Sequence, residues 1–252
     1  AQFTRTQFLS PYVVFEQAEF LATSSFKAAN FGGKAEPNNP NEVSFEDTEF
    51  HGNTHFQETR FFAKVSFDRA AFLGREAEFR KAFFQENARF ETVATAEGVL
   101  DFIDAKFAKQ CDFSFFESGN YSRVQFSRCN FGGIANFELG PCKLALFTGS
   151  TFESIVRIDA KLEKAIPNLL NTKFDRLPDL SGIDTPHSIG DISDHNDLVK
   201  IARRLKSLAT DGGDHEAAGR YFALEMAAKC KYELKQSPSF VLSWIYGVVS
   251  NY

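Results

Sequence analysis

The fold is decided by the stretch FDRAAFLGREAEFRKAFFQENARF, residues 67–90, in which phenylalanine recurs at nearly constant intervals. Phe67, Phe72, Phe79, Phe84 and Phe90 are separated by steps of 5, 7, 5 and 6 residues. An alanine stands two residues before each of the last four. One large and one small residue at a fixed offset indicate an internal repeat of supersecondary structure.

The same pattern extends in both directions along the chain. Steps of five and six dominate from residue 15 to residue 158, and the position two before each centre is small or β-branched, with Leu100 as the one bulky exception. Cys111 and Cys129 occupy this small position, which predicts that they fill space and are not reactive. The remaining centres are Phe15, Phe20, Phe26, Phe31, Phe45, Phe50, Phe56, Phe61, Phe102, Phe107, Phe113, Phe126, Phe131, Phe137, Phe147, Phe152 and Ile158.

Neither a helix nor a flat strand accommodates this spacing. Five residues advance an α-helix by about 500°, so successive rings would lie roughly 140° apart and form no stripe. In a flat strand an odd step would place alternate rings on opposite faces. A chain that turns a corner after each short strand keeps every ring inside. Four sides give coils of about 22 residues, stacked about 4.8 Å apart, so residues 3–158 predict a solenoid of about seven coils.

The repeat resembles that of the pentapeptide-repeat family, in its Phe-centred variant. Ala70-Ala71-Phe72, Ala82-Phe83-Phe84 and Ala88-Arg89-Phe90 carry the resemblance, which covers residues 1–158. It implies an all-β solenoid, a right-handed quadrilateral β-helix. Many family members step strictly by five around a central Leu, whereas alternate steps here are six, so we expect looser corners and wider coils.

The abundance of phenylalanine, 30 of 252 residues, follows from this architecture. A thin coil has no room for a globular core, so its interior should be columns of stacked rings. Each buried ring contributes about 1.5–3 kcal/mol, and its truncation to Ala costs about 3–5 kcal/mol. Phe72→Ala is therefore predicted to be severely destabilising. The pattern breaks at residues 32–42, 91–99 and 115–122, which predicts loops there.

The chain changes character after residue 160. Residues 161–190 contain three prolines and are predicted to form a cap or linker, to which Phe174 adds a degenerate last coil. Helical periodicity begins near residue 195 and resumes after Asp211-Gly212-Gly213-Asp214, ending before Pro238. Residues 191–252 are thus predicted to be an α-helical hairpin and an aromatic tail, with the hairpin covering the open end of the solenoid.

The tail, Ser239 to Tyr252, reads SFVLSWIYGVVSNY and is too short to span a bilayer. It could pack on the hairpin, form a homodimer interface or approach a membrane. The third interpretation is implied by resemblance to family members that continue into membrane-spanning, channel-like segments. The interface candidates are Phe240, Trp244 and Tyr246 of the tail, and Lys200, Arg203 and Arg204 on the basic face of the first helix.

No catalytic, cofactor-binding or metal-binding motif is present in the sequence. Four cysteines without a zinc-like spacing predict free thiols and a cytoplasmic location. His51 and His55 flank repeat centres and are predicted to face outward, and Asp197 with its neighbours is predicted to favour a helix start.

Charge divides the chain unevenly. Residues 1–160 hold 21 acidic and 16 basic residues, a net charge of −5, while residues 161–252 hold 12 of each. This sign argues against direct nucleic-acid binding. We expect a non-catalytic interaction scaffold, free or as the cytosolic part of a membrane-associated protein. The resemblance implies an alternative, a DNA mimic that binds and protects DNA gyrase.

Overall fold

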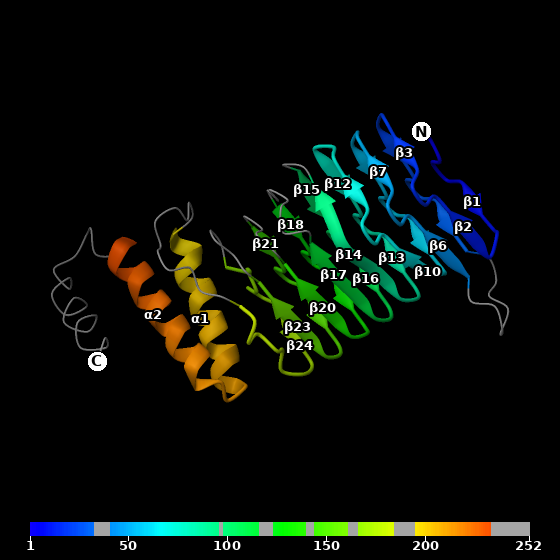
Figure 1. The fold of residues 1–252 in the computed structure, drawn as a ribbon. Helices are drawn as coiled ribbons and strands as arrows, with labels where there is room; N and C mark the ends of the chain where they lie inside the picture. Colours follow the sequence, from blue (N-terminus) through cyan, green and yellow to red (C-terminus); the bar gives the residue numbers. More distant parts are fainter. Residues whose placement is uncertain are drawn as a thin grey trace.

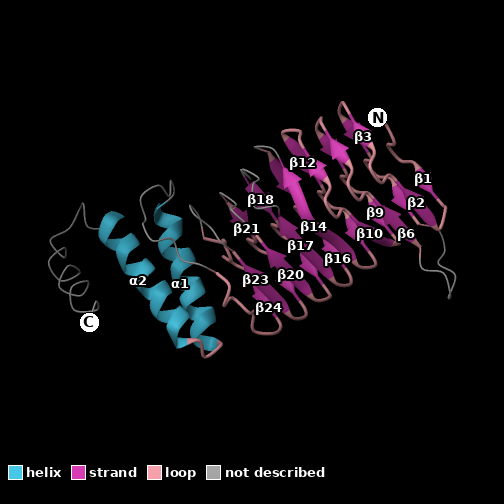
Figure 2. Cartoon of the chain, viewed as in Figure 1, coloured by secondary structure: helices cyan, strands magenta, loops and turns pink. Residues whose placement is uncertain are grey.

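A computed structural model describes residues 1–32, 41–95, 98–115, 123–139, 144–160, 166–183 and 195–232. Within these ranges the chain forms a parallel β-solenoid followed by two α-helices (Figures 1 and 2). All strand pairs in this part of the chain are parallel, and they belong to four sets, one for each side of the coil. The predicted all-β solenoid with a C-terminal helical hairpin is therefore confirmed.

The first face carries the longest unbranched ladder. Its strands, in spatial and sequence order, are β1 (Gln7–Phe8), β5 (Asn30–Phe31), β9 (Arg60–Phe61), β13 (Phe83–Phe84), β16 (Lys106–Phe107), β19 (Asn130–Phe131), β22 (Thr151–Phe152) and β24 (Lys173–Phe174). Phe174 thus belongs to a last coil, as the sequence predicts. Away from the insertion between β5 and β9, the pairing of consecutive coils is offset by 21 to 24 residues, from Phe131 with Phe152 to Phe107 with Phe131.

The second face is built from longer strands. They are β2 (Tyr12–Val14), β6 (Glu42–Ser44), β10 (Lys64–Ser66), β14 (Ala88–Thr95), β17 (Cys111–Phe115), β20 (Ala135–Glu138) and β23 (Val156–Asp159).

The remaining two faces are shorter. The third has β3 (Glu19–Phe20), β7 (Glu49–Phe50), β11 (Ala71–Phe72) and the end of β14, and the fourth has β4 (Ser24–Ser25), β8 (Thr54–His55), β12 (Glu76–Glu78), β15 (Val99–Asp101), β18 (Arg123–Gln125) and β21 (Ala145–Leu146). The solenoid has about six turns rather than the predicted seven, because the terminal coils do not pair on every face.

One predicted loop is partly a strand. Residues 91–95 lack a Phe centre, yet β14 continues through them, around a corner, with Ala94 opposite Ala71. Loss of a core side chain has not removed the backbone pairing. Residues 33–40, 96–97 and 116–122 of the predicted loops lie outside the described residues.

Alternate corners of the coil differ in kind, which explains the alternation of steps. At five-residue steps the carbonyl of one Phe accepts a hydrogen bond from the amide three residues on, as between Phe56 and Thr59 (3.2 Å). The third residue of each such turn has φ near +57°, as at Glu58 (φ 60°), which is the geometry of a type II turn. At six-residue steps the chain turns the corner without this hydrogen bond between the carbonyl of the Phe and the amide three residues on. Two turn corners therefore alternate with two open corners in each coil.

The interior is a set of phenylalanine columns, as predicted. Phe56 stacks on Phe26 at 4.7 Å and on Phe79 at 4.8 Å, with interplanar angles of 3° and 7°. Neighbouring columns meet edge to face, as Phe45 meets Phe56 at 5.5 Å and 85°. Both arrangements suit the quadrupole of the ring. A ring in the middle of a column, such as Phe56, is thus held from above, below and the side.

Most of the small residues beside the rings are buried, and the threonines and Cys129 among them also donate hydrogen bonds. Thr48 donates to the carbonyl of Phe15 (2.8 Å) and Thr59 to that of Phe26 (2.7 Å), one coil away. Cys129 occupies an equivalent place against Phe102, and Cys111 is fully buried. Burial raises the pKa of both thiols, which agrees with their predicted role as filler.

The hairpin consists of α1 (His195–Asp211) and α2 (His215–Tyr232). Asp214 caps α2 by accepting a hydrogen bond from the amide of Ala217 (2.9 Å). Apolar residues of both helices join one buried cluster with Leu169, Leu180 and Ile183 of the last coil, which confirms that the hairpin covers this end (Figure 1). No helix in the described ranges has the length and apolarity needed to cross a membrane.

Candidate interaction surface

The second face of the solenoid carries two columns of polar residues on its outer side, among which Ser44, Ser66 and Asp68 are buried. Because corresponding residues of successive coils are in register, outward residues align along the solenoid axis. We call these two columns the polar face. The first column is Ser44, Ser66, Arg89, Asp112, Asn136 and Arg157, and the second, two residues further along each strand, is Glu46, Asp68, Glu91, Ser114, Glu138 and Asp159.

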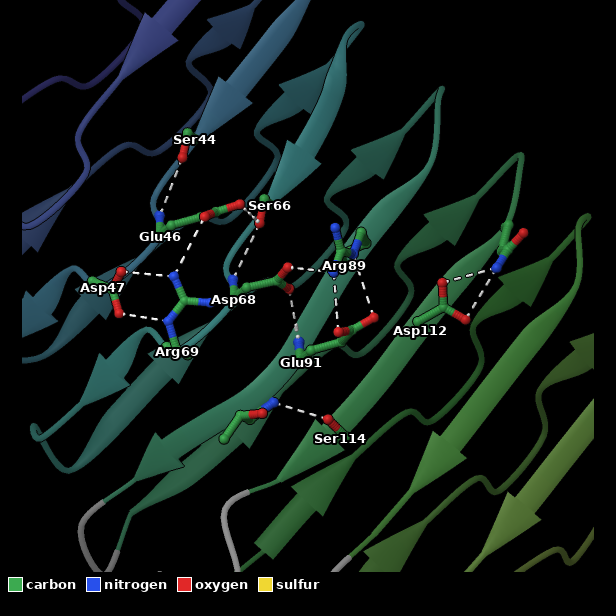
Figure 3. A network of polar contacts seen from close by, with 12 residues as sticks. Ser44, Glu46, Asp47, Ser66, Asp68, Arg69, Arg89, Glu91, Asp112 and Ser114 are labelled. Atoms are coloured by element: carbon green, nitrogen blue, oxygen red, sulfur yellow. Dashed lines mark hydrogen bonds and ion pairs between the residues drawn. The ribbon is translucent and has the colours of Figure 1, made fainter.

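In the N-terminal part of the polar face, carboxylates are paired with arginines (Figure 3). The guanidinium of Arg89 lies 2.8 Å from Asp68 and 3.0 Å from Glu91. At the adjoining corner Arg69 holds Asp47 through two bonds of 2.7 Å. These pairs link neighbouring coils, and the two arginines balance two of the four carboxylates that they contact, Glu46, Asp47, Asp68 and Glu91.

Asp68 is the most buried carboxylate of this network. Burial raises its pKa, while the amide of Glu91 and the charge of Arg89 act in the opposite direction. Its side chain is 5% exposed, and it accepts a hydrogen bond from that amide at 3.0 Å. Asp68 therefore acts mainly as a structural link between coils.

Further along, the polar face forms a groove of about 440 Å³ over β14, β17, β20 and β23. Four carboxylates and one guanidinium line it, a formal net charge of −3. The polar lining side chains are Glu91, Asp112, Ser114, Asn136, Glu138, Arg157 and Asp159.

The carboxylates of the groove differ in how they are held. Asp112 accepts hydrogen bonds from Gln110 (2.9 Å) and Asn136 (2.7 Å), and Asp159 pairs with Arg157 at 2.8 Å. Glu138 is exposed and has no ionic partner among the described residues. The groove thus combines fixed acceptors with one carboxylate that is available to a ligand.

The predicted basic face on α1 is divided among three different environments. Lys200 is exposed and contacts Asp197 (3.3 Å). Arg203 pairs with Glu225 of α2 (3.0 Å), and Arg204 donates to the carbonyl of Thr172 in the last coil (2.9 Å). Arg203 and Arg204 therefore hold the hairpin together and attach it to the solenoid. Phe240, Trp244 and Tyr246 lie outside the described residues.

Glu225 is the centre of an ionic cluster that the sequence did not predict. Its side chain is only 3% exposed and contacts Lys206 (2.7 Å), Lys229 (2.8 Å) and Arg203 (3.0 Å). Burial alone would raise the pKa of this carboxyl, but hydrogen bonds from the three cations outweigh it and lower the pKa to about 2. The sequence does indicate that Arg203 and Lys206 share one face of the first helix, and that Glu225 and Lys229 share one face of the second. Helical spacing alone does not predict that these two faces meet.

The two histidines singled out in the sequence lie on the outer surface and contact carboxylates. His51 is 3.1 Å from Glu49, and His55 is 2.7 Å from Glu78. Among the described residues there is no group of three or more His, Cys, Asp or Glu side chains placed to hold a metal.

Comparison with known proteins adds no family to this description. A scan against protein-family models, a search of curated proteins and a search of solved structures each gave no match.

Proposed function

We propose that this chain is a non-catalytic scaffold that binds a basic segment of a partner protein in the groove of the polar face. The observation that carries this proposal is the groove itself, with its net charge of −3 and a carboxylate, Glu138, that has no ionic partner in the described part of the chain. A rigid solenoid presents such a surface without a conformational cost on binding. Complementary charge would guide an incoming basic segment.

A peptide library panned against the protein tests this proposal. Peptides enriched by the wild type should be basic, and Glu138→Lys should weaken their binding by about tenfold or more. Glu76→Lys is the matched control. Glu76 is exposed on β12, on a different face of the solenoid from the groove, and its substitution changes the net charge by the same amount. No enrichment, or equal weakening by both substitutions, would dismiss the groove as a binding site.

The DNA-mimic alternative has less support from this surface. A mimic needs a dense row of unpaired negative charge, whereas Asp47, Asp68 and Glu91 are each paired with an arginine. A supercoiling assay with a gyrase poison separates the two functions. Protection of gyrase by the protein would favour the mimic over the scaffold.

The proposal includes membership of the pentapeptide-repeat family and a cytoplasmic location. Parallel coils of 21 to 24 residues with Phe columns support a place in the pentapeptide-repeat family. Buried free thiols at Cys111 and Cys129 support a cytoplasmic location. Liposome flotation with and without residues 239–252 tests membrane association, and equal partitioning would exclude a role for the tail.

A further inference from the structure

An apolar stripe runs along the corner of the solenoid that leads into the polar face. Ile134, Ile155 and Leu177 are 40%, 48% and 57% exposed. They occupy the same position in three consecutive coils, because the residues two further along each coil pair with one another. Exposed apolar side chains scattered singly over a surface are ordinary, whereas these three form one stripe, which we call the ridge.

The solenoid does not require apolar residues at this position. In three earlier coils the same position holds Lys64, Asn87 and Gln110, all of them polar and exposed. The strands that follow are paired in the same register in both parts of the solenoid. The exposed apolar surface of the ridge is therefore not needed for the stacking of coils, which points to a partner that covers it.

The ridge lies directly beside the acidic groove. Ile134 comes just before β20, and Asn136 and Glu138 of that strand line the groove. Since alternate residues of a strand point to the same side, these three residues form one outward row that runs from apolar to acidic. Ile155 begins the corresponding row on β23. Ridge and groove together form one continuous surface, apolar along one edge and negatively charged over the rest.

We propose that an amphipathic α-helix of a partner protein docks on the ridge along the solenoid axis, with lysine or arginine side chains directed into the groove. This inference rests on the proposed function and specifies the conformation and the sequence pattern of the basic segment. A helix that places its apolar stripe against an apolar surface is a common mode of peptide recognition.

The spacing of the ridge favours a helix over an extended segment. Adjacent coils are about 4.8 Å apart, so Ile134 and Leu177 are separated by about 9.6 Å along the axis. Helix residues i, i+4 and i+7 share one face and span about 10.5 Å, which matches the three side chains of the ridge. Three alternate residues of an extended strand span about 13 Å and would not match the coils.

Charge complementarity selects a basic partner for this surface. The groove has a net charge of −3, and Glu138 has no ionic partner within the described ranges. Ile134 and Glu138 are about 13 Å apart along the strand, and a helix is about 10–12 Å wide, so a long basic side chain on its flank reaches Glu138. A second copy of the chain fits less well, because ridge-to-ridge contact brings two acidic grooves together. Residues 239–252 of the chain itself contain no charged side chain for the groove.

Panning a library of 16-residue peptides against the protein tests the helix. Enriched peptides should carry apolar residues at i, i+4 and i+7 with lysine or arginine beside them, and isotope-labelled peptides should show helical chemical shifts when bound. Ile155→Ser should weaken their binding by about tenfold. Leu73→Ser is the matched control, because Leu73 is 38% exposed next to β11 on the third face, and it should leave binding unchanged.

Salt separates the apolar contribution from the electrostatic one. At about 1 M salt the screening length falls to about 3 Å, so the effect of Glu138→Lys on peptide binding should shrink while that of Ile155→Ser persists. Circular dichroism should show an unchanged fold for these variants, since every substituted side chain is exposed.

The outcomes distinguish failure of the helix from failure of the groove. Enriched basic peptides without the apolar period, bound equally by the wild type and Ile155→Ser, would overturn the helix and leave the groove as a binding site. No enriched peptide at all would dismiss both. A wild-type dimer in sedimentation velocity that Ile155→Ser dissociates would show that a second copy covers the ridge, and would overturn the partner helix.

Discussion

The solenoid buries columns of phenylalanine, whereas the helical hairpin buries mainly leucine and alanine, and the two regions are held together in different ways. In the solenoid each ring meets its counterpart one coil away, so Phe56 contacts Phe26 and Phe79 by the same rule that applies along the whole column. In the hairpin the apolar residues of the two helices pack together, and one ionic cluster around Glu225 adds contacts that occur once. Repetition distributes stability along the solenoid, whereas the hairpin depends on a few specific side chains.

Truncation of a ring in the middle of a column should have the largest effect. Phe56→Ala removes a fully buried side chain stacked on both sides, so we expect a loss of about 3–5 kcal/mol in the free energy of unfolding. Phe72→Ala should lie at the lower end of this range, because among the described residues its ring stacks on one other ring only, that of Phe50 at 5.0 Å. Urea denaturation gives both values.

The control for the ring truncations is Phe222→Ala in α2, where the ring is 38% exposed. It should cost less than about 1 kcal/mol. A loss at Phe56 as small as that at Phe222 would contradict the columns as the main source of stability.

Breaking the ionic cluster should affect the hairpin alone. Glu225→Gln leaves Arg203, Lys206 and Lys229 without a countercharge, and we expect a loss of about 2–4 kcal/mol. Hydrogen exchange should accelerate in α1 and α2 and stay unchanged in the strands. Glu216→Gln is the matched control, because that carboxylate is 86% exposed and, within the described ranges, pairs with Arg220 alone. Faster exchange throughout the solenoid would contradict local unfolding of the hairpin.

The same comparison shows what the sequence could predict. The ring columns and the small positions beside them follow a local period, so Phe174 and Cys129 could be placed from spacing alone. Bonds between residues about 20 to 33 positions apart leave no such period. The sequence therefore did not predict the pairing of Arg203 with Glu225, the contact of Arg204 with Thr172, or the role of Thr48 as a donor. The sequence did not predict the groove either, because its lining residues come from four strands that only the register between coils brings side by side.

Acid should act in opposite directions on two buried carboxylates, Glu225 of the hairpin and Asp68 of the solenoid, whereas the more exposed Asp47 and Asp104 of the solenoid have a pKa lowered by their arginine partners. The folded pKa of Glu225, about 2, lies below its ordinary value of 4.5. The stabilisation from this carboxylate is therefore complete above pH 4.5 and is lost as pH falls toward 2, up to roughly 3 kcal/mol. Asp68 of the solenoid has a raised pKa, so protonation there favours the folded state.

Hydrogen exchange measured between pH 5 and pH 3, corrected for the intrinsic pH dependence of exchange, tests this difference. We expect the protection of α1 and α2 to fall while that of β10 and β14 is kept. In Glu225→Gln the acid-dependent loss in the helices should disappear. A loss of protection that begins in the strands around Asp68 would contradict the directions assigned to the pKa shifts of Asp68 and Glu225.

The smallest expected effect concerns the turn corners, which the hairpin lacks. Ala28 has φ of 54° at a turn corner, a conformation that costs a residue with a Cβ about 1 kcal/mol. Ala28→Gly should therefore stabilise the solenoid by about 0.5–1 kcal/mol despite the greater freedom of glycine in the unfolded chain. Ala29→Gly is the matched control, because Ala29 is fully buried at the small position and is not among the residues with positive φ. Its substitution should destabilise by about 1 kcal/mol, so urea denaturation of the two variants should give shifts of opposite sign, and equal shifts would contradict the strain assigned to the corner.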